Sequence, residues 1–168
     1  MIEIREAAPA DAEQLLANIR AMLAEPDVDV PLAPDEFDLT VEREREILAE
    51  LAAAPDAVML VATAGGELVG QTSCKPVSTR RALRHAVTLG ISVRRDWRGR
   101  GVGGALVAAA IAWAERVGVR RIELNVFARN ARAIALYERH GFAIEGRRRA
   151  AICTNGEYLD DLVMARLL

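Results

Sequence analysis

One stretch of the chain constrains its fold more than any other. An apolar segment over residues 89–93 runs into a turn that carries four glycines and four arginines, and an alanine-rich segment follows at once. The β-branched residues before the turn predict a strand, and the apolar spacing after it predicts a helix. The glycines are Gly99, Gly101, Gly103 and Gly104, and the arginines are Arg94, Arg95, Arg98 and Arg100.

This arrangement of strand, turn and helix predicts a site for a phosphorylated ligand. Glycines remove the Cβ atoms that would keep a ligand away from the backbone. The first N–H groups of a helix have no intrahelical acceptor, and the helix dipole adds partial positive charge at that end. The arginines add full charges, so an anion is the natural occupant of the turn.

Three other interpretations of the turn were weighed. A P-loop needs a lysine after its second glycine, and the only lysine of the chain is Lys75, far from the turn. A dinucleotide fingerprint matches Gly99, Gly101 and Gly104 nominally, but it normally follows the first strand, and here half the chain precedes it. A tight turn whose glycines serve geometry alone stays open, although the neighbouring arginines favour a ligand.

Length and composition predict one domain over residues 1–168. The chain has 168 residues, of which 52% are hydrophobic, and this suffices for one core but not for two ordinary domains. The net charge of −2 argues against a protein that coats nucleic acid. Cys74 and Cys153 lack metal-ligand spacing, so we expect reduced thiols and no metal. Residues 1–5 alternate like a strand rather than a signal peptide, and no membrane span is apparent, which predicts a cytoplasmic protein.

Hydrophobic periodicity assigns the other elements. A helix opened by Pro9 and Asp11 is followed by a loop over residues 25–38 that carries six acidic residues. Asn155-Gly156 predicts a tight turn between the last two strands. The expected helices cover residues 11–23, 40–54, 102–117 and 130–140, and the expected strands cover residues 1–5, 58–64, 67–77, 85–94, 120–127, 142–153 and 158–167.

Two sequence blocks resemble one known family. The spacing Arg98-x-x-Gly101-x-Gly103 resembles the pyrophosphate-binding signature of the GNAT N-acetyltransferase superfamily, Gln/Arg-x-x-Gly-x-Gly/Ala. The block from Asn130 to Phe142 is similar to the later motif of that superfamily, Asn-x-x-Ala-x-x-Leu-Tyr-x-x-x-Gly-Phe. The two blocks occur in the expected order, and the resemblance covers residues 59–142 well.

The resemblance implies a fold and a cosubstrate. The implied fold is a single α/β domain in which about four helices flank a mixed, mostly antiparallel central sheet. We expect this sheet to splay between the strand that ends at Arg94 and the strand that starts at Arg120, opening a cleft for the pantetheine arm of acetyl-CoA. A homodimer through the last strands is compatible with the resemblance.

The resemblance also implies which residues bind acetyl-CoA. Backbone groups around Ile91, Ser92 and Val93 would meet the acetyl and pantetheine portion, and Asn130 would bind the pantetheine arm, a role compatible with capping a helix. The implied pyrophosphate contacts are Arg98, Gly99, Arg100, Gly101, Val102, Gly103 and Gly104.

Tyr137 falls on the family position that protonates the sulfur of coenzyme A. A phenol with a pKa of ~10 is close enough to a thiol, with a pKa of ~8.5, to deliver a proton as the thiolate forms. The competing interpretation is a tyrosine that belongs to the core of an amphipathic helix. The surrounding motif favours catalysis.

The general base is less clearly indicated. Asn125 and Thr88 stand where relatives carry a glutamate, and neither side chain can accept a proton. His85 has a suitable intrinsic pKa and is the first candidate, although a lone histidine in a strand is more often structural. Glu123 or Asp160 could act through water.

The sequence indicates that the acceptor is an amine but does not select one class of amine. The acidic loop would suit a cationic acceptor, so a polyamine, an aminoglycoside, an amino acid and a peptide N-terminus all stay open. A non-catalytic acyl-CoA-binding regulatory or scaffold domain is the rival function, motivated by the missing glutamates. Nucleic-acid binding through residues 147–149 is disfavoured by the acidic chain and its few aromatic residues.

Overall fold

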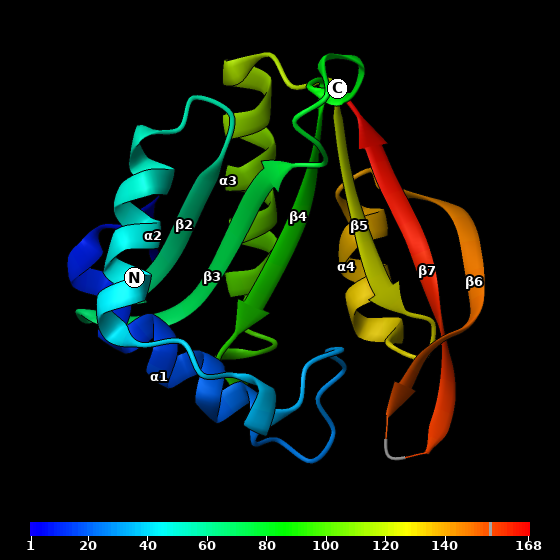
Figure 1. The fold of residues 1–168 in the computed structure, drawn as a ribbon, viewed down its shortest axis with the longest axis horizontal. Helices are drawn as coiled ribbons and strands as arrows, with labels where there is room; N and C mark the ends of the chain where they lie inside the picture. The colour runs from blue at the N-terminus through cyan, green and yellow to red at the C-terminus, as the bar shows by residue number, and fades with distance from the viewer. Residues whose placement is uncertain (155) are drawn as a thin grey trace.

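The computed structural model describes residues 1–154 and 156–168, which form one seven-stranded sheet with helices on both faces (Figure 1). The strands are β1 Glu3–Glu6, β2 Val58–Ala64, β3 Glu67–Pro76, β4 Ala86–Val93, β5 Arg121–Phe127, β6 Ala143–Thr154 and β7 Glu157–Leu167. The α-helices are α1 Ala12–Leu23, α2 Val41–Ala53, α3 Val102–Val117 and α4 Ala131–Arg139. Short 3-10 helices cover Pro9–Asp11, Pro34–Glu36, Arg81–Leu83 and Arg95–Trp97. No helix in these ranges is long and apolar enough to cross a membrane.

The sheet has the order β1-β2-β3-β4-β5-β7-β6, and all neighbours are antiparallel except β4 and β5. These two parallel strands pair only from Ala86 with Arg121 to Thr88 with Glu123. Beyond Thr88 they part, and Figure 1 shows the sheet open between them. The predicted splay is therefore confirmed, as is the mixed, mostly antiparallel sheet.

Each face of the sheet has its own apolar cluster, because side chains alternate between faces along a strand. On one face, Leu15 of α1 and Leu48 of α2 pack against Val61 and Leu68. On the other face, α3 and α4 cover a larger cluster that includes Ile122 of β5. The alanine-rich sequence of α3 suits this burial, since small side chains let the helix approach the sheet closely.

The first helical turn differs from its prediction. Pro9–Asp11 forms a 3-10 helix, and α1 begins one residue later, at Ala12. The Asp11 carboxylate accepts two hydrogen bonds of 2.7 Å from the Arg5 guanidinium and one of 2.8 Å from the Ala8 N–H. These bonds hold the pKa of Asp11 below its usual value, the Arg5 contact being the largest cause. Asp11 thus ties β1 to the start of α1.

The last hairpin and the strand before the glycine turn also refine the predictions. Asn155 of the expected Asn155-Gly156 turn lies outside the described residues, and Gly156 has a φ of +77°, as such a turn requires. β4 begins at Ala86, so His85 belongs to the preceding turn rather than to the strand.

Replacing Asp11 by Asn should lower the free energy of unfolding at neutral pH by about 1 to 2 kcal/mol, because the amide keeps the shape and loses the charge-assisted bonds. The folded-state pKa of Asp11 lies below its usual 3.8, so this stabilisation is present at neutral pH and disappears as the pH falls through the folded-state value. Urea denaturation of both proteins at several pH values measures this.

Asp35→Asn is the control, because the exposed Asp35 occupies the second 3-10 helix of the same type and forms no ion pair within the described residues. An equal loss of stability in both variants, or a difference that does not shrink as the pH falls below 3.8, would contradict the role given to Asp11.

Candidate active site

The open edge of β4 is the first component of the site. The Arg94 N–H donates to the Val69 carbonyl at 3.0 Å, and backbone groups in an antiparallel pair alternate between its two sides. The N–H and C=O groups of Ile91 and Val93 therefore point away from β3, toward the side where β5 has departed. The backbone groups of Ser92 point toward β3 instead.

The edge of β5 faces this opening from the other side. The Ala128 N–H donates to the Asp160 carbonyl at 2.9 Å, and the same alternation directs the backbone groups of Asn125 and Phe127 away from β7. Two strand edges thus face the gap between β4 and β5. The Val93 carbonyl accepts from Arg98 Nε and the Phe127 carbonyl accepts from the Asn130 N–H, so the groups of Ile91 and Asn125 and the N–H groups of Val93 and Phe127 remain for a ligand. An extended ligand with amide groups can hydrogen-bond to both edges.

The glycine turn follows β4 directly and starts α3. Gly99 and Gly101 have φ values of +78° and +85°, which L side chains rarely adopt, and Gly101 is the N-cap of α3. Among the described residues, none accepts a hydrogen bond from the backbone N–H groups of residues 99–104. These donors can bind an anion, because the helix dipole also favours negative charge there.

Gly103 has a further reason to be glycine. A Cβ on Gly103 would lie 3.2 Å from Leu136 Cδ2 of α4, which is a tight contact, so this glycine lets α3 approach α4 closely. A Cβ on Gly104 would lie 3.5 Å from His140 Cε1, an ordinary van der Waals distance. The N–H groups of both residues remain available.

The four arginines of the turn do not all contribute free charge. Arg94 binds Asp96 and Glu67, Arg95 binds Asp27 at 3.0 Å, and Arg98 binds Glu25 at 2.6 and 2.7 Å. Arg100 lies over the Trp97 ring, 5.1 Å from its centroid, and forms no ion pair with any described residue. The expectation of four full charges is therefore wrong: Arg100 and the backbone N–H groups supply the uncompensated positive charge.

Tyr137 lies on α4 with its ring in the core, and only 6% of the residue is exposed. The ring packs against Phe142 at a centroid distance of 5.8 Å, and burial raises the pKa of the phenol to about 12. Its hydroxyl makes no hydrogen bond to a described residue, and no fully buried side-chain oxygen there lacks a partner, so solvent reaches the hydroxyl. The ring is structural while the hydroxyl stays accessible.

Asn130 is the N-cap of α4, as predicted. Its Oδ1 accepts a hydrogen bond of 3.0 Å from the Ala133 N–H, which stabilises the first turn of the helix. The side-chain NH2 group forms no bond to a described residue and can donate to a ligand. Capping and ligand binding are thus compatible here.

The structure does not bring His85 to the open part of the cleft. Its carbonyl accepts from the N–H groups of Arg120 and Arg121, at the end where β4 and β5 are joined. The side chain is exposed there. Gly90 lies five positions further along the chain, which in a strand is about 16 Å. This position disfavours His85 as the base.

The other candidates for the base carry no free carboxylate. Glu123 accepts from Arg121 at 2.9 Å, and Asp160 accepts from Arg147 at 2.7 Å and from the Ala150 N–H. The Ala150 N–H bond, and then Arg147, lowers the pKa of Asp160, which makes it a weaker base. Asn125 is exposed on β5. No group of three metal-ligating side chains occurs in the described part of the chain.

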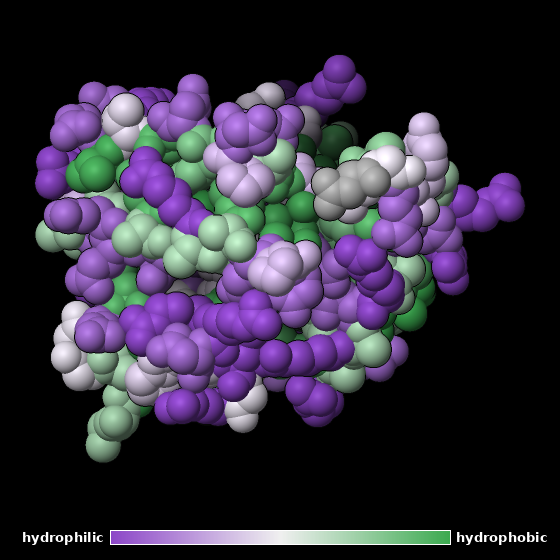
Figure 2. Space-filling view, turned by 90° about the horizontal axis from the view of Figure 1, so that it is seen from below, coloured by the Kyte–Doolittle hydropathy of each residue, from purple (hydrophilic) through white to green (hydrophobic). Residues whose placement is uncertain are grey.

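The acidic loop between α1 and α2 lies at the end of the sheet where β4 and β5 part (Figure 1). Besides Glu25 and Asp27, its Asp29 accepts from Arg129 at 2.8 Å, on the β5 side of the opening. Figure 2 views this end and shows hydrophilic side chains around a recess with hydrophobic residues at its base. Since arginines compensate three of its carboxylates, the loop charge alone does not select a cationic acceptor.

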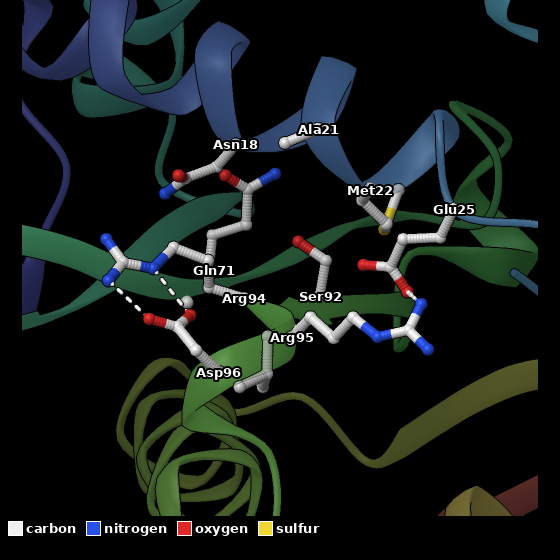
Figure 3. A pocket seen from close by; sticks show the side chains of 11 residues that line it. Asn18, Ala21, Met22, Glu25, Gln71, Ser92, Arg94, Arg95 and Asp96 are labelled. Carbon is white, nitrogen blue, oxygen red and sulfur yellow. Dashed lines mark hydrogen bonds and ion pairs between the residues drawn. The ribbon is translucent and has the colours of Figure 1, made fainter.

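A pocket of about 350 Å³ opens beside this loop, on the face of the sheet that α1 covers. Figure 3 shows Asn18 and Met22 of α1 above it and Gln71 and Ser92 pointing into it from β3 and β4. Glu25 lies at its rim. The pocket offers amide and hydroxyl groups to a small polar molecule.

Comparison with known proteins adds independent evidence. The sequence model described as "Acetyltransferase (GNAT) family" matches residues 23–142. The chain is 40% identical over 118 residues to the L-amino acid N-acetyltransferase AaaT of Escherichia coli (strain K12), covering 70% of this chain and 72% of that protein.

Solved structures share the whole fold. A GNAT-family acetyltransferase from Streptococcus pneumoniae superposes with a TM-score of 0.95 and 32% identity, over 100% of both chains. The structure of yncA from Salmonella typhimurium with its cofactor acetyl-CoA gives a TM-score of 0.89 at 20% identity, over 100% of this chain and 94% of that one.

The glycine turn yields a direct test. Gly101→Glu should abolish the rise in melting temperature that coenzyme A causes, because it places bulk and negative charge beside the free N–H groups. Gly118→Glu is the matched control, since Gly118 caps the other end of α3 with a similar φ of +79°. Thermal melts with and without ligand decide the matter. Equal ligand-induced shifts in both variants would show that the turn does not hold the ligand.

Proposed function

The chain belongs to the acetyltransferase (GNAT) family and is an N-acetyltransferase, and we propose that it moves the acetyl group of acetyl-CoA directly to the primary amine of a small acceptor, with Tyr137 as general acid. The observation that carries this proposal is the cleft itself, where open strand edges lead to a turn with free N–H groups. The buried tyrosine with an accessible hydroxyl lies on the helix that packs against that turn.

The residues present fit acetyl-CoA, which supplies the acetyl thioester and leaves as the thiol. The N–H groups of residues 99–104 and the guanidinium of Arg100 would bind the diphosphate. The edge groups of Ile91 and the N–H of Val93 would bind the amide-bearing pantetheine arm, together with the side-chain NH2 group of Asn130. Ser92 would contribute through its side chain, on the other face of the sheet.

Tyr137 would donate its proton to the departing sulfur. Burial raises the pKa of the phenol to about 12, so the hydroxyl stays protonated throughout the neutral and mildly alkaline range. The same apolar surroundings raise the cost of a free thiolate, which makes a proton donor at this point more valuable. Water would take the proton of the amine, because the nearby carboxylates are bound by arginines.

An amino acid or a similarly small amine is the acceptor class we favour. AaaT acts on L-amino acids according to its name, and the pocket lined by Gln71 and Ser92 has the volume of a small molecule. The acceptor would approach from the α1 face. We also propose a cytoplasmic location. We further propose a homodimer formed by β6 and β7, because β6 is an edge strand with mostly exposed residues.

A panel of amines tests the reaction. With acetyl-CoA and thiol release as the readout, we expect turnover with free L-amino acids to exceed turnover with polyamines, aminoglycosides or peptides. The rival function, a non-catalytic acyl-CoA-binding domain, would show coenzyme A binding without thiol release for any amine. Release with polyamines alone would contradict the acceptor class and leave the reaction type intact.

Tyr137→Phe should lower kcat by roughly 10 to 1,000 fold, because it removes the acid while keeping the ring and its packing. The dissociation constant of coenzyme A should stay nearly unchanged, since the proton is needed only as the carbon–sulfur bond breaks. Steady-state kinetics and calorimetry separate the two quantities.

Tyr158→Phe serves as the control, because Tyr158 is 72% exposed on β7 and should tolerate the same change. Full turnover of the Tyr137 variant would rule out the acid role. Loss of coenzyme A binding together with a lower melting temperature would show that Tyr137 is only a core residue.

A further inference from the structure

We propose that Glu25 is a positioning residue of the acetyl-CoA site, which makes Arg98 a brace for the glycine turn rather than a ligand of the diphosphate. This inference rests on the proposed function and names how one end of that site is held. Glu25 follows α1, on one face of the sheet, and Arg98 belongs to the turn that starts α3, on the other. Their contact therefore crosses the end of the sheet.

Three of the five N–H groups of the Arg98 guanidinium are engaged within the protein. Its Nη1 and Nη2 donate to Glu25 Oε2 and Oε1 at 2.6 and 2.7 Å, and its Nε donates to the Val93 carbonyl at 2.9 Å. The side chain of Glu25 is only 9% exposed and that of Arg98 is 26% exposed. A bidentate pair in this setting fixes a guanidinium in position and orientation.

The brace acts where the turn has little other support. The N–H groups of Trp97 and Arg98 close the 3-10 helix, but those of residues 99–104 have no acceptor among the described residues. The Arg98 side chain joins this segment back to Val93, the last residue of β4. The Nε bond also occupies the Val93 carbonyl on the open edge of β4. This carbonyl oxygen therefore presents less negative charge to the gap between β4 and β5.

The charge of Arg98 is already compensated, which argues against direct diphosphate binding. A phosphate that took the edge of Arg98 facing Glu25 would have to break two short charge-assisted bonds and leave the largely buried Glu25 carboxylate without its partner. The free N–H groups and Arg100 need no such exchange. The geometry therefore assigns Arg98 to holding the turn and Glu25 to holding Arg98.

The direction in which Glu25→Gln changes the affinity for coenzyme A distinguishes a positioning role of Glu25 from competition between Glu25 and the diphosphate for Arg98. Glu25→Gln should raise the dissociation constant of coenzyme A about tenfold, because the amide loses the paired bonds that hold Arg98. If Glu25 merely competed with the diphosphate for Arg98, the same change would tighten binding. Calorimetry with coenzyme A therefore overturns the proposal if affinity rises or stays the same.

Asp27→Asn is the matched control for charge. It removes one carboxylate from the same loop, but Asp27 and its partner Arg95 are 68% and 58% exposed, so we expect less than about a twofold change. An equal weakening in both variants would overturn the specific role of Glu25. If the parent protein does not bind coenzyme A at all, the proposed function fails first, and this result is distinguishable from a variant effect.

A double-mutant cycle tests whether Glu25 acts through Arg98. Arg98→Gln should weaken coenzyme A by about the same factor as Glu25→Gln, and the double variant should be no weaker than either one. A much larger loss from Arg98→Gln would show that Arg98 contacts the diphosphate, and additive losses would show independent roles. This cycle also decides the matter if Glu25→Gln lowers stability.

An acetyl donor without the diphosphate distinguishes a role of Glu25 in positioning the glycine turn from general disruption of the site. S-acetylpantetheine lacks the diphosphate, so Glu25→Gln should leave kcat/KM for this thioester unchanged while raising the KM for acetyl-CoA and sparing its kcat. A comparable loss with both donors would mean that the whole cleft is perturbed, and it would overturn the assignment.

Discussion

The parting of β4 from β5 is the constraint on which the rest of the site depends. Strand edges carry N–H and C=O groups that need partners, and an edge inside a domain is normally paired or covered. Here the two strands pair for only three residues each and then diverge. The groups of Ile91, Val93 and Asn125 are left facing each other across the gap. A ligand with amides along an extended arm satisfies such edges in the way that a missing strand would.

Most of the positive charges around the glycine turn are compensated by carboxylates. The sequence brings many arginines to the glycine turn, yet most of them are held by carboxylates from the acidic loop or from nearby residues. This compensation limits repulsion within the turn, and it leaves oriented backbone dipoles as the main source of positive potential there. Arg100 is the exception, because stacking on Trp97 orients its guanidinium without neutralising it.

Local patterns in the sequence predicted most of the elements and the glycine turn that starts α3, because periodicity, glycine spacing and N-caps act over a few residues. The helix after the turn begins at Val102 and the cap of α4 is Asn130, both as expected. Contacts between distant segments could not be predicted in this way. Nothing in the sequence pairs Glu25 with Arg98, which lies 73 positions later, and the placement of His85 at the joined end of the strands depends on where β5 begins. The spacing from Trp97 to Arg100 was a signal for their contact that the sequence analysis did not use.

The glycine signature combines two physical requirements that sequence spacing cannot distinguish. Gly99 and Gly101 have a positive φ, whereas a Cβ on Gly103 would lie only 3.2 Å from Leu136 Cδ2 of α4. Leu136 is the neighbour of Tyr137, so the close approach of α3 and α4 also fixes the helix that carries the tyrosine. Gly103, which allows the contact between α3 and α4, thus helps to fix the position of Tyr137 relative to the turn. One helix contact therefore fixes both the turn and Tyr137 relative to each other.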